Sequence, residues 1–417
     1  MSQAHTVRRL PVAGFLAGTG LSLLGNQIAM LAIPWFVLNE TGSASQTGFA
    51  GVATALPMAL SGLLGGPLID RVGGRRMSII SDVVSAVAVA LIPILYRLDV
   101  LNYPLILLLI FLGAMLDIPG VTARRMLLPG FQKQAGLRSE QMNTAFEVLT
   151  NLAGMVGPAI AGVLIVLMGP VNLLWLTVVG FLCSATGVLL LAPTHEVDRA
   201  APARQPYLES MREGFAFIAK TKVLLSLAVM FCVSNAISNG FFSVSLPVFV
   251  YETWGSAARL GVQFSALGIG TLVGALTYGA VGHRVREHRR LIIVAGFCSQ
   301  PLWFGAYLIS DSLPVLLGAM FLMGISSGPA NPLSVTVRFE HIPKALQGRV
   351  FGTFSAITAT VSPIGIAASG LIVERWGVHT GILVVVIAYA IFAVILPFVT
   401  PLRDMNRPGP YADQVPS

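Results

Sequence analysis

The stretch GPLIDRVGGRR, from Gly66 to Arg76, is a short charged interruption between two long apolar runs. It holds three arginines and one acid, Asp70, in a chain of 417 residues that is 55% hydrophobic and only 11% charged. Soluble domains are typically about one quarter charged, so water is not the main solvent of this chain. Apolar runs long enough to cross a membrane as helices, about 18 residues or more, recur from end to end. The sequence therefore predicts an all-α integral membrane protein whose charged stretches are loops.

Glycines, prolines and charge clusters divide the apolar runs into twelve predicted transmembrane helices. They are expected at residues 11–38, 46–69, 77–97, 103–128, 142–168, 171–193, 223–251, 257–282, 290–310, 313–337, 347–373 and 378–400. When successive loops are assigned to alternate sides, every Lys and Arg falls on the N-terminal side except Arg97, Arg259 and Arg375. Because positive charge gathers in cytoplasmic loops, both termini are expected in the cytoplasm.

The chain also contains an internal repeat. IPWFVLNETGSA, starting at Ile33, reappears as LPVFVYETWGSA, starting at Leu246, a shift of 213 residues. The same shift pairs GPLIDRVGGRR with GAVGHRVREHRR and places His283 opposite Asp70. A repeated unit of six spans predicts two pseudo-symmetric six-helix bundles, residues 1–193 and 223–417, related by an axis along the membrane normal. Residues 194–222, rich in Pro, Ala and charge, are expected to be a cytoplasmic tether.

Several other classes of function find no support in the sequence. The net charge is +8, but the arginines form short clusters between apolar runs without a DNA- or RNA-binding motif, so no nucleic-acid partner is expected. The six histidines have no metal-ligand spacing, and the three cysteines lie within apolar runs. No nucleophile elbow or phosphate-binding loop is present, so neither an enzyme, a metal site nor a cofactor is expected. Without an ATP-binding motif, a proton gradient is the expected energy source.

The twelve spans, the repeat and the charged loop together resemble the major facilitator superfamily. The signature loop of that family, between its second and third helices, is matched by Gly66, Leu68, Asp70, Arg71, Gly73, Arg75 and Arg76. The segments TARRMLLP, from Thr122, and RSEQMNTAFEV, from Arg138, resemble the branch that contains macrolide-efflux and siderophore-export proteins. The resemblance implies a transporter that exports its substrate, and it implies that Asp70 belongs to a latch between the two halves.

A further pattern of this family, the glycine-rich fifth helix of drug/proton antiporters, is partly matched by Gly157, Pro158 and Gly162. Thr144 and Ala153 stand where that pattern has glycines. The match predicts a helix-packing role for the three residues and gives the antiport inference only partial support.

Acidic residues within the predicted spans are candidates for proton coupling, because a charge in the bilayer is costly and is kept for a partner, a pathway or a proton. Asp117 and Glu147 are the main candidates, and Asp82 is a third acid of this kind. Glu147 could instead pair with a basic loop residue. Asp117 could instead cap the helix that restarts at Pro119 and pair with the Arg71–Arg76 cluster, as part of the gate.

Polar and aromatic side chains at mid-span are candidates for the substrate cavity. They are Asn26, Gln27, Asn151, Asn235, Asn239, Gln300 and Trp303. An amide in hydrocarbon needs a partner, so each one either forms an interhelical hydrogen bond or faces water and substrate. The repeat gives Asn26 and Asn239 equivalent positions. A cavity of amides and aromatic rings with few charges would suit a bulky, largely apolar molecule.

These observations predict a monomeric, multi-pass transporter of the cell membrane that moves small hydrophobic or amphipathic compounds outward in exchange for protons. A proton-coupled importer or a uniporter remains an alternative within transport. A transport-inactive membrane receptor with the same fold is an alternative from another class. The expected partners are the lipid bilayer, a small-molecule substrate and protons.

Overall fold

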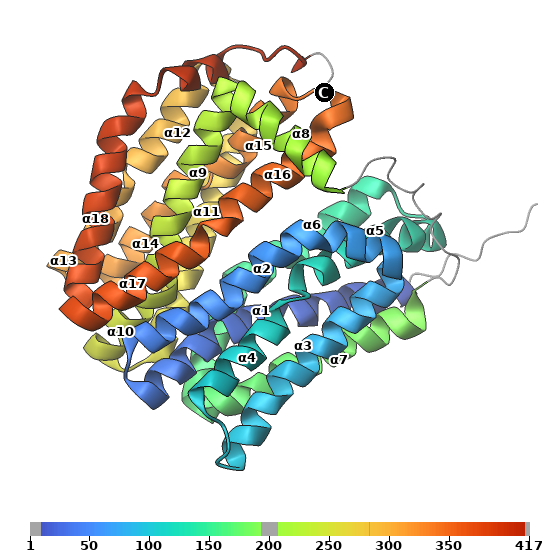
Figure 1. Cartoon of the computed structure of the whole chain (residues 1–417), viewed down its shortest axis with the longest axis vertical. Coiled ribbons are helices and arrows are strands. Elements are labelled where there is room, and N and C mark those ends of the chain that lie inside the picture. The colour runs from blue at the N-terminus through green and yellow to red at the C-terminus, as the bar shows by residue number, and fades with distance from the viewer. Residues whose placement is uncertain (1–9, 193–206, 283, 413–417) are drawn as a thin grey trace, which may run out of the picture. The chain divides into compact units, whose positions relative to one another are not determined.

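The computed structural model describes residues 10–192, 207–282 and 284–412, without the side chains of residues 62–67, 207, 208 and 210. Helices make up the regular structure of these residues, and no strand is found among them. Figure 1 shows the helices running as long rods through each part of the chain. This observation agrees with the all-α prediction.

Seven helices precede the predicted linker. They are α1 (Leu10–Thr41), α2 (Ala44–Val72), α3 (Gly74–Arg97), α4 (Tyr103–Ala114), α5 (Asp117–Ala135), α6 (Ser139–Met168) and α7 (Pro170–Leu191). The later helices are α8 (Tyr207–Lys220), α9 (Lys222–Gly240), α10 (Leu246–Trp254), α11 (Ala257–Val281), α12 (Arg289–Cys298), α13 (Gln300–Ile309), α14 (Leu313–Ser327), α15 (Ala330–His341), α16 (Gln347–Thr360), α17 (Ser362–Trp376) and α18 (Val378–Ile395). A π-helical turn, Phe241–Ser245, joins α9 to α10.

Among the described residues, eleven continuous helical segments are long and apolar enough to cross a membrane. The twelfth segment is α2, with 29 residues, part of whose side chains lie outside the described set. Each predicted span overlaps one of these segments, so the prediction of twelve membrane helices is confirmed.

Several spans are built from two helices because a proline interrupts them. Pro119, Pro301 and Pro363 lie within the first three residues of α5, α13 and α17, and Pro329 lies in the break before α15. Proline lacks the N–H that would continue the hydrogen-bond ladder, and its ring crowds the carbonyl four residues earlier. Pro119 and Pro329 occupy corresponding spans in the two halves, so the repeat includes the break as well as the helices.

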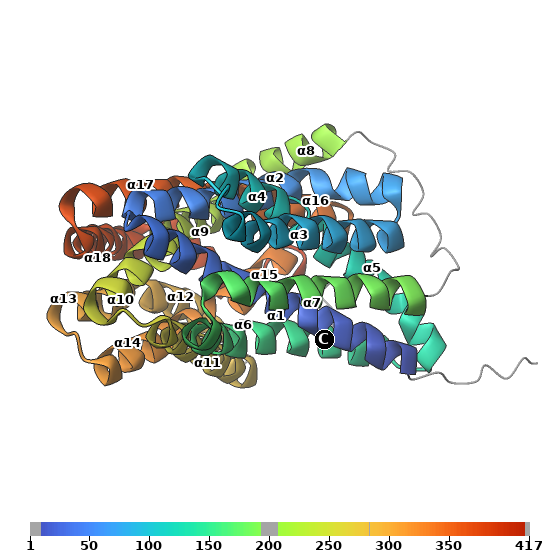
Figure 2. The same cartoon turned by 90° about the horizontal axis from the view of Figure 1, so that it is seen from below.

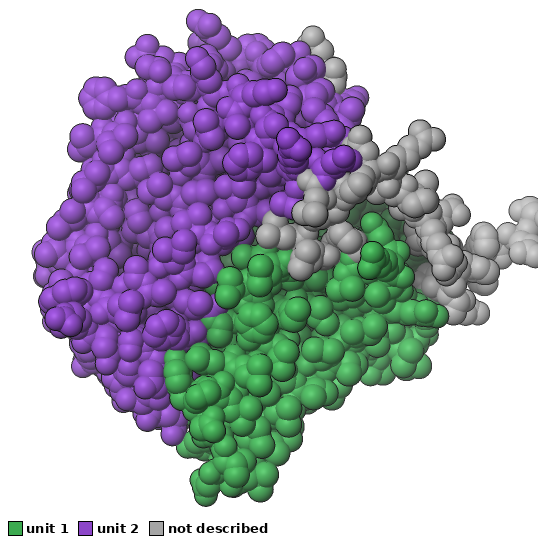
Figure 3. Space-filling view, viewed as in Figure 1, with its two compact units in different colours: residues 1–36, 53–204 green, residues 37–52, 205–417 purple. Residues whose placement is uncertain are grey.

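Contacts between helix backbones divide the chain into two compact units, residues 1–36 with 53–204 and residues 37–52 with 205–417 (Figure 3). In the first unit, α3 packs against α5 and α7. In the second unit, α11 packs along α14, and both views show these two helices side by side (Figure 2). Glycine permits this approach, since a Cβ at Gly328 would lie 2.8 Å from the backbone nitrogen of Ala275.

The end of α1 and the beginning of α2, residues 37–52, belong to the second unit. The remaining residues of both helices belong to the first unit. The Glu374 carboxylate of α17 accepts hydrogen bonds of 3.0 Å from the Ser43 hydroxyl and from the Ser45 backbone N–H. These donors lie where α2 begins, and an acid is favourable at the positive N-terminal end of a helix. Glu374 therefore acts as a cap for α2.

The predicted linker, residues 194–222, is more ordered than a tether, because residues 207–220 form α8. Within the second unit, α8 lies against α16 (Figure 1). Gly214 and Ile218 are buried on this contact face, whereas Arg212, Glu213 and Lys220 are exposed. The amphipathic pattern explains why these residues form a helix: one face can be covered and the other solvated. Residues 194–206 lie outside the described part of the chain.

Candidate functional site

A buried ion pair fixes the centre of the first unit. Arg124 Nη1, on α5, lies 2.7 and 2.9 Å from the two carboxylate oxygens of Asp82, on α3. Both side chains are 2% exposed. Ser22 donates a hydrogen bond of 3.3 Å to Asp82, and Arg124 donates one of 3.3 Å to Ser184. Removing two charges from water is tolerated here because each meets the other and further hydrogen bonds.

A second buried ion pair occupies corresponding spans of the second unit. Arg289, on α12, donates to both carboxylate oxygens of Glu340, on α15, at 2.8 and 3.0 Å. Arg286 adds a third contact to Glu340 at 3.2 Å. The acid comes first along the chain in the first unit and the base comes first in the second, so the repeated architecture carries the pair in reversed order.

These pairs correct one part of the sequence interpretation. Arg124 and Arg289 were both counted as loop cations when the Lys and Arg residues were sorted by side. The structure buries both within helix packing, because each has an acid within hydrogen-bonding distance. Each of these arginines therefore contributes to the internal packing of its unit.

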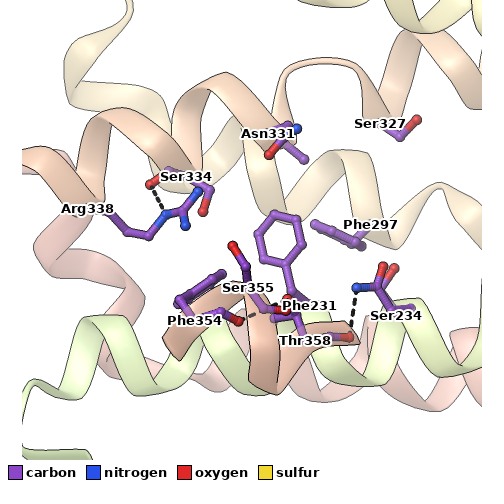
Figure 4. A pocket seen from close by; sticks show the side chains of 12 residues that line it. Phe231, Ser234, Phe297, Ser327, Asn331, Ser334, Arg338, Phe354, Ser355 and Thr358 are labelled. Carbon is purple, nitrogen blue, oxygen red and sulfur yellow. Dashed lines mark hydrogen bonds between the residues drawn. The ribbon is translucent and has the colours of Figure 1, made fainter. Parts of the chain in front are cut away.

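The second unit contains a pocket with a volume of about 390 Å³ (Figure 4). Side chains from α9, α12, α14, α15 and α16 line it. Phe231, Phe297 and Phe354 supply aromatic walls, and Phe231 meets each of the other two rings edge to face at 6.0 and 6.2 Å between centroids. The volume falls in the range of small-molecule pockets, about 300–1,000 Å³.

One wall of this pocket is polar. Ser327, at the end of α14, is followed by Asn331, Ser334 and Arg338 on α15, and all four line the pocket. Successive spacings of four, three and four residues are those of one helical face. A polar face within a span that is otherwise apolar can be read from the sequence and indicates a face turned toward a polar cavity.

Arg338 is the charged residue of this wall and, like Asn331 and Ser334, was not predicted from the sequence. It was counted as a loop cation, but its side chain is 6% exposed and lines the pocket. Its guanidinium carbon lies 4.5 Å from the ring centre of Phe351 and 4.4 Å from that of Phe354. Nε donates to the Ser334 carbonyl at 3.3 Å. Across the described residues, no carboxylate lies within 4.0 Å of this guanidinium.

The polar residues predicted for a cavity in the second half separate into different roles. Asn235 lines the pocket and donates to the Thr358 carbonyl at 3.2 Å. Asn239 lies one turn away and donates to the Asn235 carbonyl and to the Ser362 hydroxyl. Gln300 is buried against the Gly296 carbonyl, and Trp303 donates to the Ser299 hydroxyl. Asn235 alone of these four is brought to the pocket.

In the first unit, the residues predicted for the cavity lie on α1 and α6. Asn26 and Gln27 are half-buried on α1, and Asn151 is exposed on α6. Gly157 allows α6 to approach α1, because a Cβ there would lie 2.6 Å from the Gln27 Cβ. Pro158 and Gly162, the other residues of the predicted packing motif, are buried on the same helix.

The two candidate proton-coupling acids differ in their surroundings. Glu147 pairs with Arg125 at 2.9 Å, and both side chains are about half exposed, at 51% and 50%. Asp117 is the first residue of α5 and accepts a hydrogen bond of 3.3 Å from Ser85. Across the described residues, no Lys or Arg lies within 4.0 Å of its carboxylate, so the expected pairing with the Arg71–Arg76 cluster is not formed here.

The charged loop quoted at the outset forms the tight connection between α2 and α3. Gly73 separates the helices with φ of +87°, a conformation that glycine adopts without steric cost. Leu68, Asp70, Arg71 and Arg76 are exposed, and Arg75 donates to the Leu189 carbonyl at 2.6 Å. Gly66 lies within the part of α2 without described side chains, and His283, the repeat counterpart of Asp70, lies outside the described residues.

Comparison with known proteins gives consistent results along the whole chain. The family model described as "Major Facilitator Superfamily" matches residues 15–250 and 232–414. The multidrug efflux pump Tap of Mycolicibacterium fortuitum is 30% identical over 92% of this chain and 94% of its own. The macrolide efflux protein A of Streptococcus pyogenes is 24% identical over 94% of this chain and 96% of its own. These relatives confirm the resemblance to the efflux branch.

Solved structures share the fold at low sequence identity. The nucleoside transporter NupG has a TM-score of 0.73 at 14% identity and covers 94% of this chain and 99% of its own. A bacterial homolog of the human lysosomal transporter Spinster has a TM-score of 0.71 at 12% identity and covers 98% of this chain and 100% of its own. At these identities the likeness speaks for the fold and not for the substrate.

Proposed function

Because the chain belongs to the Major Facilitator Superfamily, we propose that it exports small hydrophobic or amphipathic compounds across the cell membrane by alternating access, with protons as the coupling ion. In this mechanism, two six-helix halves rock around a site near the middle of the membrane. Transport by this mechanism makes and breaks no covalent bond in the substrate, as is expected for a member of a transporter family.

The pocket of the second unit is the observation that carries the proposal. It combines aromatic walls, which suit an apolar ring system, with a polar face that can orient the molecule. It lies among transmembrane helices, where a soluble partner or a large polymer has no access. Similarity to a multidrug efflux pump and to a macrolide efflux protein supports outward transport of compounds of this kind.

Proton coupling requires a group that gains and loses a proton during the cycle. We assign this role to Asp117 in preference to Glu147, because Asp117 is held by a neutral serine, whereas Glu147 already has an arginine partner. A carboxylate without a cationic partner is less strongly held in its charged form. Asp117 also lies at the break between α4 and α5, where a change of charge can alter the geometry of the helix.

The orientation follows from the charge distribution. With both termini in the cytoplasm, the Gly66–Arg76 loop is cytoplasmic and places Asp70 at the end of α2. We propose that Asp70 serves as a conformational latch rather than as a substrate ligand, since it lies at the rim of the span and is not among the residues that line the pocket.

An accumulation assay in cells tests the function. Cells that express the protein are expected to accumulate less of a fluorescent dye or a macrolide than empty-vector cells, and a protonophore is expected to restore accumulation. Increased accumulation on expression would favour the importer instead. No difference across a broad compound panel would count against drug efflux.

A further inference from the structure

We propose that Arg338 is an anion-binding residue of the pocket, and that the protein therefore favours aromatic substrates that carry a carboxylate or sulfonate group. This inference rests on the proposed function in that it assigns the pocket to a transported compound. It goes beyond that function in naming the charge of the substrate and the residue that selects it.

The contacts of Arg338 determine which of its atoms are available. Phe351 and Phe354 lie over the guanidinium at 4.5 and 4.4 Å, distances at which the rings attract the cation. Such an attraction stabilises the positive charge but uses none of the N–H groups of the guanidinium. Nε is used by the Ser334 carbonyl, and across the described residues no hydrogen bond is formed by Nη1 or Nη2. Those two nitrogens form the fork that binds carboxylates and related anions.

The other buried arginines show that Arg338 is unusual in this protein. Arg124 and Arg289 each donate to an acid at 2.7 to 3.0 Å. Arg338 is buried to a similar degree but has no acid beside it. Two aromatic rings compensate the charge of a buried cation less fully than an acid does, so the burial of Arg338 points to an anionic partner that arrives with the substrate.

The acid nearest in sequence cannot serve as this partner. Glu340 lies two residues along α15, and residues two apart on a helix point to different faces. Its carboxylate is already bound by Arg289 and Arg286. Arg338 therefore remains the cationic side chain of the pocket face.

The rest of the pocket defines the shape of the ligand. The Ser334 hydroxyl is buried without a hydrogen-bond partner and lines the same wall as Arg338 (Figure 4). An unpaired buried hydroxyl is unfavourable, and an anion bound at Arg338 would give it an acceptor. Phe231 and Phe297 offer ring surfaces across the cavity. A volume of about 390 Å³ accommodates a molecule of two or three fused rings with one acidic group.

Calorimetric binding of three probes of similar shape tests the inference. Naphthalene-2-sulfonate, 2-naphthylmethanol and 2-naphthylmethylammonium would be titrated into the protein in phosphatidylcholine nanodiscs, with empty nanodiscs as the blank. The wild type is expected to bind the sulfonate at least about 10-fold more tightly than the alcohol, the effect of one charge-assisted hydrogen bond. The ammonium compound is expected to bind most weakly. Equal affinities for the three probes would overturn the inference.

Variants connect this preference to the residue. Arg338→Gln is expected to weaken sulfonate binding about 10- to 100-fold and alcohol binding less than about 3-fold. Ser334→Ala removes the hydroxyl without touching the charge and is expected to weaken sulfonate binding several-fold, which provides a test if Arg338→Gln does not fold. Arg403→Gln, at an exposed arginine outside the pocket, is the matched control and is expected to bind all three probes as the wild type does.

The outcomes separate this inference from the proposed function. An unchanged sulfonate preference in Arg338→Gln, or in Ser334→Ala where the former does not fold, would overturn the inference even if cells still export other compounds. A sulfonate preference that depends on Arg338 supports the inference even if no gradient-driven export is found, since binding is measured without a gradient.

Discussion

Arg124 and Arg125 are neighbours in the sequence, but the structure gives them very different contributions to stability. Arg124 is 2% exposed and pairs with an equally buried Asp82, whereas Arg125 and its partner Glu147 are about half exposed. Among the described residues, Arg124→Gln would leave the Asp82 carboxylate with the Ser22 hydroxyl, at 3.3 Å, as its hydrogen-bond partner. Breaking a buried pair from one side costs about 3–5 kcal/mol of unfolding free energy. An exposed pair such as that of Arg125 is worth about 1 kcal/mol or less, so Arg125→Gln is expected to cost no more than this.

A double variant shows whether the cost comes from the unpaired charge. Asp82→Asn with Arg124→Gln removes both charges and leaves two amides that can hydrogen-bond, so it is expected to be more stable than either single variant. Unfolding in mixed detergent micelles, followed by circular dichroism, would measure the wild type, the three single variants and the double variant. Equal losses for Arg124→Gln and Arg125→Gln, or a double variant whose loss is the sum of the single losses, would refute the reasoning.

Other residues give further expected outcomes. At Gly365 a Cβ would overlap the facing backbone of α9, so Gly365→Ala is expected to lower the unfolding free energy by about 1–3 kcal/mol. A Cβ at Gly305 would meet open space, so Gly305→Ala is expected to change the unfolding free energy by less than about 1 kcal/mol. The same unfolding experiment in micelles measures both variants. Asp117→Asn is expected to abolish the protonophore-sensitive part of export and Glu147→Gln to retain it; the reverse pattern in the accumulation assay would transfer the coupling role to Glu147. Asp70→Asn is expected to lower the maximal transport rate with little change in the half-saturating substrate concentration, and a selective loss of affinity would contradict a latch.

The sequence was sufficient to predict the membrane helices because each span must satisfy its own backbone in hydrocarbon, which makes hydropathy and length decisive. The breaks in the helices were also readable from proline, as at Pro119 and Pro329. The π-helical turn at Phe241–Ser245 had no comparable signal, because it reflects local packing of α9 against α17 and α18 rather than composition.

The site was less predictable, because the loop interpretation treated each arginine in the same way. Counting charges by side cannot distinguish Arg338, which is buried beside two rings, from Arg403, which is exposed. The spacing of Ser334 and Arg338 on one face of α15 would have provided the missing signal. The role of Glu374 likewise had no sequence signal, because its carboxylate meets the N-terminus of α2 only through the packing of the second unit.

The most direct test of gradient-driven export uses the purified protein in liposomes, free of other pumps. A pH gradient would be imposed across proteoliposomes and across matched liposomes with Asp117→Asn, and movement of the compounds that gave a signal in cells would be followed. The account predicts that a compound moves opposite to the protons, against its own gradient, with the wild type and not with Asp117→Asn. Movement in the same direction as the protons, or no dependence on the pH gradient for any compound, would contradict it.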